Sequence, residues 1–281
     1  MAKKGFQSKK KNYTDKAMSF WEHLEVLRWH ILRSAIAIVV FSTIAFLYKD
    51  IIFDKIILSP KEPGFITSQL LCRMGAWLNI PDLCINVKSL KIINTEMAGQ
   101  FNMHIFISII TGVILAVPYF LWELWRFIKP ALSENERKHS GGFVIITSLL
   151  FLTGVVFSYF LIVPLTINFL GTYYVSEHVE NYFTLSSYIN TITSLTFATG
   201  LVFELPVLVY FLTKIGILTP KFLKKYRRHA IVLILIVAAI ITPPDVFSQT
   251  MVAIPLYILF EASIYICKVV YKKKHAASVT T

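Results

Sequence analysis

The sequence predicts an all-α integral membrane protein, a bundle of six membrane-spanning helices with both termini on the cytoplasmic side. Of its 281 residues, 56% are hydrophobic and the mean hydropathy is +0.63, which is too apolar for a soluble domain of this length. Apolar runs of about 18–20 residues can cross a hydrocarbon core of roughly 30 Å. Six apolar runs lie near 31–48, 104–121, 143–163, 194–212, 230–241 and 251–270, and all but the fifth are about this long.

The basic residues between these runs are sorted by side. Of the 28 Lys and Arg residues, 22 lie in 1–33, 122–142, 213–229 and 268–281, and six lie in 49–103. Basic residues stay on the cytoplasmic side during insertion, so we expect both tails and the loops 122–142 and 213–229 in the cytoplasm. Attraction to anionic lipid explains the net charge of +12, and nucleic-acid binding is not expected.

The elements follow in chain order. Residues 1–17, polar and rich in Lys, predict a disordered basic N-tail. Residues 18–271 predict the six-helix domain, in which 18–33 form an amphipathic helix that leads straight into the first span. An external insertion covers about 60–95, and its part 70–83 is apolar enough for a short helix. Residues 272–281 are expected to be a cytoplasmic C-tail.

The fifth apolar run is short for a membrane crossing. It has 12 residues, 230–241, or about 18 Å of helix. A span of this length must thin the bilayer locally or draw polar ends inward.

Cysteine and histidine residues give no sign of catalysis or metal binding. Cys72 and Cys84 both lie in the external insertion, and Cys267 lies near the cytoplasmic end of the last span. The external pair could form a disulfide in an oxidising compartment, and two separate reduced thiols are an equal alternative. His23 and His30 are expected at the membrane interface. No cluster has the spacing of metal ligands, so no cofactor is expected.

Glu204 is the sharpest single feature, because it lies in the middle of the fourth apolar run. A carboxylate at that depth costs a few kcal/mol and usually faces a cavity or a polar partner. Pro206 predicts a kink in the same helix. The alternative is a carboxylate held for packing by neighbouring hydroxyl groups. Hydroxyl residues of this run could line a wet groove with Glu204: Thr191, Thr193, Ser194, Thr196 and Thr199.

Acidic residues also occur in two predicted cytoplasmic segments. Glu22 and Glu25 precede the first span near Arg28, and Glu136 lies beside Arg137 in the loop 122–142. Each acid alone is typical of a solvated charge. Together they suit a docking site for a cationic ligand, because carboxylates pair bidentately with guanidinium groups.

With these residues identified, the chain resembles the TatC family, the multispanning receptor subunit of the twin-arginine protein translocase. The resemblance covers nearly all of 18–271 and rests on four motifs in combination. They are HLEVLR at 23–28, FIKPAL at 127–132 followed by Glu136 and Arg137, FELP at 203–206, and TPPDVFSQ at 242–249.

The resemblance implies a protein of the bacterial cytoplasmic membrane that is not an enzyme. Such a protein binds Arg-Arg signal peptides of folded precursors at its cytoplasmic face and forms homo-oligomers in the receptor complex. It assembles with TatA/TatB-type single-span subunits, and the proton-motive force drives export. The fold implied is a concave, glove-like bundle with short fifth and sixth spans.

Motif position also implies roles for individual residues. Partner docking inside the membrane is assigned to Glu204 with Thr199. A structural external turn is assigned to Pro243, Pro244 and Asp245. Signal-peptide binding is assigned to Glu136, Arg137, Phe127, Glu25, Glu22 and Arg28.

One position departs from the family pattern. The family's first motif carries a second cytoplasmic carboxylate where this chain has Val26. Glu25 is one residue early, turned about 100° around the helix, and Glu22 is four residues earlier, on the face of Val26. Either acid could supply the missing charge, or the site relies more on Glu136.

Two other classes of function compete with this interpretation. A proton-coupled small-solute permease could use Glu204, although such proteins often show repeats and two broken helices in matching positions, and neither is evident here. An intramembrane enzyme could use Glu204 as a base, but no nucleophile or metal partner accompanies it in the sequence.

Overall fold

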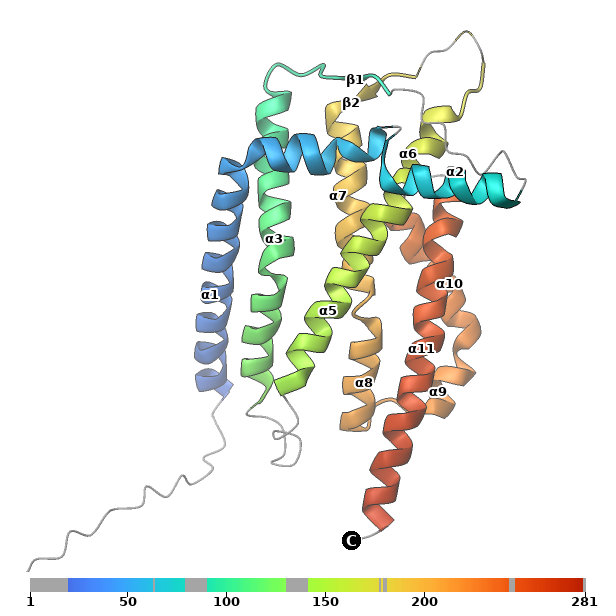
Figure 1. The fold of residues 1–281 in the computed structure, drawn as a ribbon. Helices are drawn as coiled ribbons and strands as arrows, with labels where there is room; N and C mark the ends of the chain where they lie inside the picture. The colour runs from blue at the N-terminus through green and yellow to red at the C-terminus, as the bar shows by residue number, and fades with distance from the viewer. Residues whose placement is uncertain are drawn as a thin grey trace, which may run out of the picture.

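The computed structural model describes residues 20–62, 64–78, 90–129, 141–176, 178, 181–242 and 246–279. Most of these residues are helical, and the long helices form one bundle (Figure 1). In chain order the elements are α1 Phe20–Leu47, η1 Ile51–Ile57, η2 Ser59–Lys61, α2 Ile66–Leu78, β1 Ile92–Ile93, α3 Gly99–Ile128, α5 Gly141–Phe157, η5 Ser158–Ile162, α6 Val163–Thr172, β2 Phe183–Thr184, α7 Leu185–Val202, α8 Leu205–Ile215, α9 Pro220–Lys225, α10 Arg227–Ile241 and α11 Val246–Val279.

Length and composition of the helices confirm the all-α membrane class. In the described part of the chain, five helical segments are long and apolar enough to cross a membrane: Leu24–Leu47, Gly99–Ile128, Gly142–Thr172, Leu185–Ile215 and Gln249–Lys272. The expected fifth span is α10, a helix of 15 residues, hence about 22 Å long. It is shorter than the roughly 30 Å core, so the count of six crossings and their orientation stay predictions.

Several helices are longer than the apolar runs predicted. α1 is continuous from Phe20 to Leu47, which confirms that the amphipathic lead-in and the first span form one helix. α3 continues to Ile128, so the start of the expected loop 122–142 is helical. α11 continues to Val279, into the segment expected as the C-tail.

Two of the long rods are interrupted next to prolines. The rod α5–α6 contains the π-helical segment η5, followed by Pro164 in the first turn of α6. Phe203 and Glu204 separate α7 from α8, and Pro206 lies in the first turn of α8. Proline has no N–H to bond the carbonyl four residues earlier, so the ladder is lost there. The kink predicted at Pro206 is present as this break.

The main apolar core lies in the half of the bundle farthest from Phe20. α1 packs along α3, α5 along α7, and α8 along α11. Buried core residues come from α3, α6, α7 and α11, among them Ile107, Val163, Ile189 and Val252. In the half nearer to Phe20, cavities lie between α3, α5 and α8 and between α5, α8 and α11. The main apolar core thus lies at one end of the bundle, the core end, and these two cavities lie at the other.

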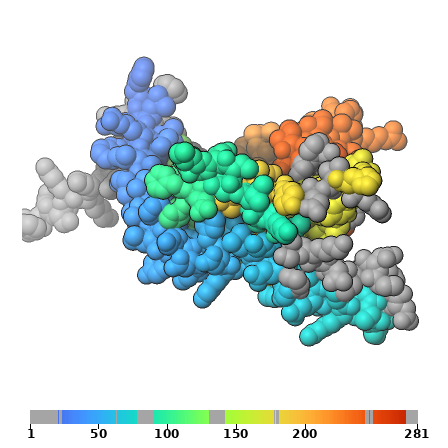
Figure 2. Space-filling model, turned by 90° about the horizontal axis from the view of Figure 1, so that it is seen from above, coloured from blue at the N-terminus to red at the C-terminus, as the bar shows by residue number. Residues whose placement is uncertain are grey.

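Short elements cover the core end of the bundle (Figure 1). β1 and β2 form a two-residue parallel ladder, Ile92 opposite Phe183 and Ile93 opposite Thr184, which the sequence did not predict. Seen from this end in Figure 2, η1 follows one side of α3 and α2 projects from a corner of the molecule. α2 confirms the short helix expected in the external insertion, beginning four residues earlier than predicted.

Two of the three cysteines, Cys72 and Cys267, lie among the described residues. Cys72, in α2, is disulfide-bonded, and Cys267, in α11, is a free and buried thiol. Cys84 lies outside the described residues. So do the N-tail at 1–17 and the predicted external turn of Pro243, Pro244 and Asp245.

Candidate functional site

The first candidate site lies where the beginning of α1 meets the end of α3. His30 of α1 joins the two helices: its Nδ1 hydrogen-bonds Oε2 of Glu123, and its ring lies edge-on to Phe127 with 6.0 Å between the ring centroids. The motif at 23–28 is thereby held beside Phe127, with which the second motif begins.

Glu123 is a residue that the sequence analysis missed. It is 1% exposed, and both of its carboxylate oxygens are paired, because Tyr119 Oη donates to Oε1 at 2.9 Å. His30 is only 8% exposed because it lies between α1 and α3, and its expected place at the membrane interface stays a prediction. The sequence predicts a loop from residue 122, and this hides the signal. Tyr119 and Glu123 stand four residues apart on an aromatic helix, a spacing at which side chains meet.

The register of α1 orders the two N-terminal acids. His30 marks the face of α1 that packs on α3. At 100° per residue, the helical position of Glu22 lies about 80° from that of His30, whereas the position of Glu25 lies about 140° away. Position 22 is therefore nearer to the α3 face. Glu25 itself is exposed, as is Val26.

Glu136 and Arg137 lie outside the described residues, within 130–140. The described part of α3 and its cap ends at Lys129, two residues beyond Phe127. The described part of α3 thus ends next to the His30 contact. The meeting of Glu136 with the acids of α1 stays a prediction. Arg28, the last residue of the first motif, is exposed on α1.

The second candidate site is the break between α7 and α8. The Glu204 N–H donates to the Leu201 carbonyl at 3.1 Å, and the Glu204 carbonyl accepts from the N–H groups of Val207 and Leu208, both at 3.0 Å. Glu204 therefore begins α8, and its side chain makes no capping hydrogen bond. The break turns a half-buried carboxylate away from the regular helix ladder.

Glu204 lines a cavity of about 270 Å³ between α3, α5 and α7–α8. Two buried polar atoms of this cavity have no hydrogen-bond partner among the described residues, Oε1 of Glu204 and Nε1 of Trp125. The hydroxyl group of Thr147, which also lines the cavity, already donates to the Phe143 carbonyl at 2.8 Å. Buried polar groups are normally hydrogen-bonded, so one acceptor and one donor are available here to a polar group that enters from the membrane.

None of the hydroxyl residues expected to line a wet groove with Glu204 lines this cavity. Thr199 is fully buried and does not line the cavity. The hydroxyl groups of Thr191 and Thr193 donate to carbonyl oxygens one turn earlier, at 2.9 and 2.8 Å. Thr in a helix commonly satisfies its hydroxyl in this way, so hydroxyl residues in a helical run need not mark a wet surface. In the described residues no group of His, Cys, Asp and Glu side chains could hold a metal ion.

Comparison with known proteins agrees with this arrangement. The family model of the Sec-independent protein translocase protein (TatC) matches residues 22–255. The chain belongs to the TatC family. It is 42% identical over 259 residues to the Sec-independent protein translocase protein TatC of Blattabacterium sp. subsp. Periplaneta americana (strain BPLAN), which covers 92% of this chain and 97% of that relative.

Another relative and a solved structure extend the likeness. TatC of Helicobacter pylori (strain ATCC 700392 / 26695) is 45% identical over 194 residues, 69% of this chain and 76% of the relative. A crystal structure of the twin arginine translocase receptor TatC superposes with a TM-score of 0.71 at 32% identity, covering 89% of this chain and 99% of the other. The protein is thus a multi-pass membrane component of the Sec-independent translocase, with a role in protein transport.

Proposed function

We propose that this protein is the receptor subunit of a twin-arginine translocase. It binds the Arg-Arg signal peptides of folded precursors at its cytoplasmic face. It assembles with further copies of itself and with TatA/TatB-type single-span subunits for export driven by the proton-motive force. The observation that carries the proposal is the contact of His30 with Glu123 and Phe127, which holds the first cytoplasmic motif against the beginning of the second.

Carboxylates supply the recognition chemistry. A guanidinium group presents a planar fork of donors that a carboxylate accepts bidentately. The first turns of α1 carry Glu22 and Glu25, and the segment after Phe127 carries Glu136. Acids on two segments, two on α1 and one after Phe127, suit the two guanidinium groups of an Arg-Arg pair.

The test is signal-peptide crosslinking in membranes at fixed salt, comparing an Arg-Arg peptide with its Lys-Lys counterpart. Glu136→Lys replaces an acceptor with a like charge and should abolish binding of the Arg-Arg peptide. Loss of one partner of a desolvated pair costs about 2–5 kcal/mol, or roughly 30- to 4,000-fold in affinity. Glu96→Lys, an exposed acid before α3 at the opposite end of the bundle, is the matched control. Unchanged binding by Glu136→Lys would remove the proposed site.

The N-terminal acids refine the same experiment. Glu22→Ala and Glu25→Ala should each weaken crosslinking less than Glu136→Ala. Because position 22 lies nearer to the α3 face, Glu22→Ala should have the larger effect of the two. Val26→Glu restores the family's charge at an exposed position and should be tolerated or tighten binding.

Glu204 and Trp125 supply the second part of the proposal. Their unpaired acceptor and donor suit a polar group on a membrane-embedded segment of a partner or signal peptide. Thr199 is not part of this cavity, and its predicted part in docking stays untested. A proton-coupled small-solute permease is the alternative that the same carboxylate supports. Solute uptake by the purified protein alone, lost in Glu204→Gln, would favour the permease, whereas copurification with single-span subunits would favour the translocase.

A further inference from the structure

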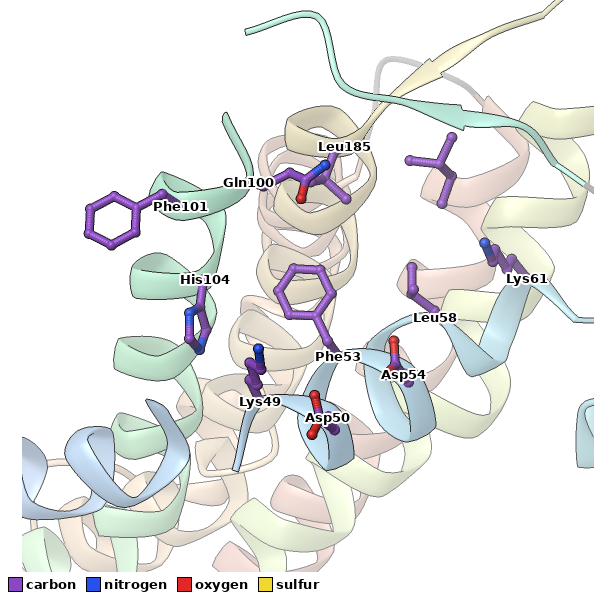
Figure 3. A pocket seen from close by; sticks show the side chains of 11 residues that line it. Lys49, Asp50, Phe53, Asp54, Leu58, Lys61, Gln100, Phe101, His104 and Leu185 are labelled. Atoms are coloured by element: carbon purple, nitrogen blue, oxygen red, sulfur yellow. The ribbon is translucent and has the colours of Figure 1, made fainter. Parts of the chain in front are cut away.

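A cavity of about 520 Å³ lies at the core end of the bundle, far from both candidate sites. Its walls are η1, the beginning of α3, the beginning of α7 and β1 (Figure 3). Phe53 of η1 projects between these walls, and Leu58 after η1 and Leu185 at the beginning of α7 add further apolar lining. The cavity size is typical of sites for small ligands.

Four charged side chains line this cavity, Lys49, Asp50, Asp54 and Lys61. Their charges cancel, with two positive and two negative. Ion pairs between described residues occur at His30–Glu123 and Arg227–Glu261, and none involves these four groups. In Figure 3, Lys49, which precedes η1, and Asp54 of η1 lie on either side of the Phe53 ring, and Lys61 approaches from the far end. The open cavity therefore offers unpaired cations and unpaired carboxylates along one wall.

His104 and Gln100 add neutral polar groups to the wall. The His104 ring stacks on Phe46 with 4.1 Å between centroids, and its Nε2 lies 3.1 Å from the Phe46 carbonyl oxygen. Donation from Nε2 to that carbonyl orients the imidazole and leaves Nδ1 free to accept. The wall is thus held in place by its own contacts.

The cavity lies at the boundary of a membrane span. Leu47 ends the apolar segment of α1, and Lys49 follows two residues later. Large apolar side chains surround this level and face outward, with Leu47 73% exposed, Tyr48 60% and Phe101 61%. A Tyr and a Lys directly after an apolar span are typical of the interface where lipid headgroups lie.

We propose that this cavity binds the headgroup of a zwitterionic phospholipid that carries a primary ammonium group. The lysines attract the phosphate, and the carboxylates of Asp50 and Asp54 attract the ammonium group. The acyl chains follow the exposed apolar faces of α1 and α3. An anionic headgroup without an ammonium group would satisfy the lysines but leave both carboxylates unpaired and repelled. One phosphate for the two lysines and one ammonium group for the two carboxylates therefore match a phosphoethanolamine group.

The experiment is native mass spectrometry of the purified full-length protein in detergent. The probes are phosphatidylethanolamine, phosphatidylglycerol of the same acyl chains and water-soluble glycerophosphoethanolamine. We expect the protein to retain phosphatidylethanolamine over phosphatidylglycerol, and glycerophosphoethanolamine to compete for the site at higher concentration. Competition by the soluble compound shows that the headgroup is recognised. Its failure to compete at any concentration, together with equal retention of both lipids, would overturn the proposal.

Two double variants separate the two charges. Lys49→Gln/Lys61→Gln should lower retention of phosphatidylethanolamine by about fivefold, the effect of a pair of partly exposed charge contacts. Asp50→Asn/Asp54→Asn should reverse the preference and favour phosphatidylglycerol, which is a gain that a misfolded variant could not give. Lys55→Gln and Glu96→Gln remove exposed charges that do not line the cavity and should leave both retentions unchanged. A preference that survives both double variants would refute the assignment.

Discussion

Glu123 and Glu204 are two carboxylates in apolar helices that differ in their hydrogen bonding. Glu123 is 1% exposed, and His30 and Tyr119 occupy its two oxygens. Glu204 has one buried oxygen without a partner, and that oxygen faces a cavity. A saturated carboxylate stabilises a contact between helices, whereas an unsaturated one is available to a ligand. We therefore assign Glu123 to positioning α1 on α3, whereas docking by Glu204 stays a prediction.

The His30–Glu123 pair should behave as a unit. Removing one partner of a buried pair leaves an uncompensated polar group and costs about 3–5 kcal/mol. We expect His30→Ala and Glu123→Ala each to lower the unfolding temperature of the purified protein. The double variant should lose much less than the sum of the two, because both polar groups are gone.

The control for this cycle is an ion pair at the surface. Arg227 Nη2 and Glu261 Oε2 are 2.8 Å apart, and both side chains are partly exposed. Exposed pairs contribute about 0–1 kcal/mol, so Arg227→Ala should change the unfolding temperature little. Equal effects at the two pairs, or additive effects of His30→Ala and Glu123→Ala, would contradict the assignment of Glu123.

Glu204→Ala should separate the two sites of the proposed function. Crosslinking of the signal peptide should stay nearly intact, because the cavity lies away from the contact of His30 with Phe127. Export of a folded precursor, or copurification of the single-span partners, should fall. Glu204→Gln keeps an acceptor for the docked group and should retain more export than Glu204→Ala. Normal export by the Ala variant would reduce Glu204 to a packing residue.

At the scale of elements, prolines and a disulfide bond add features that the pattern of apolar residues does not specify. Pro206 divides the fourth rod and so places Glu204 at the beginning of α8. Pro164 follows the π-helical turn η5 in the third rod. Cys72 ties α2, a helix whose Ile66 and Trp77 are largely exposed, through a disulfide bond. The two prolines interrupt helices at points where the apolar pattern of the sequence continues.

The disulfide gives a prediction for α2. With Cys267 free, we expect the partner of Cys72 to be Cys84, closing a loop with 11 residues between the two cysteines. Denatured, non-reduced protein should take up one alkylating group, at Cys267, and reduced protein should take up three. The bond should stabilise the fold by about 2–3 kcal/mol. Three alkylated cysteines before reduction would show that the external thiols are free.

At the scale of the whole molecule, the main core and the proposed translocase sites lie at opposite ends of the bundle. The core of α3, α6, α7 and α11 lies under the short elements η1, β1 and β2. The two proposed translocase sites lie in the other half, where α1, α3, α5 and α8 approach their ends. The proposal that signal peptides bind at the cytoplasmic face therefore requires the end with the proposed translocase sites to face the cytoplasm.

Topology tests that orientation directly. In a variant with its native cysteines replaced by Ser, Ser187→Cys should react with an impermeant thiol reagent from outside intact cells. Ser187 is exposed in the first turn of α7, at the core end of the bundle. Lys221→Cys, on the exposed face of α9, should react only after lysis. The reverse pattern would invert the model of insertion drawn from the 22 cytoplasmic basic residues.

The sequence by itself determined the class of this protein, the positions of most spans and the family. Apolar runs and the sorting of Lys and Arg are averages over 15 to 30 residues, so single exceptions do not disturb them. The break at Glu204 was also predictable, because Pro206 acts locally on its own helix. Family membership followed from short motifs that need no knowledge of packing.

Only the tertiary structure decided which polar side chains meet. The pairing of His30 with Glu123 spans 93 residues, and no local pattern specifies a partner at that distance. No local pattern predicts that Trp125 shares a cavity with Glu204 either, and the sequence analysis expected Thr199 beside Glu204 instead. Composition records that a buried polar group needs a partner, but packing between helices selects which partner it finds, or leaves it open for a ligand.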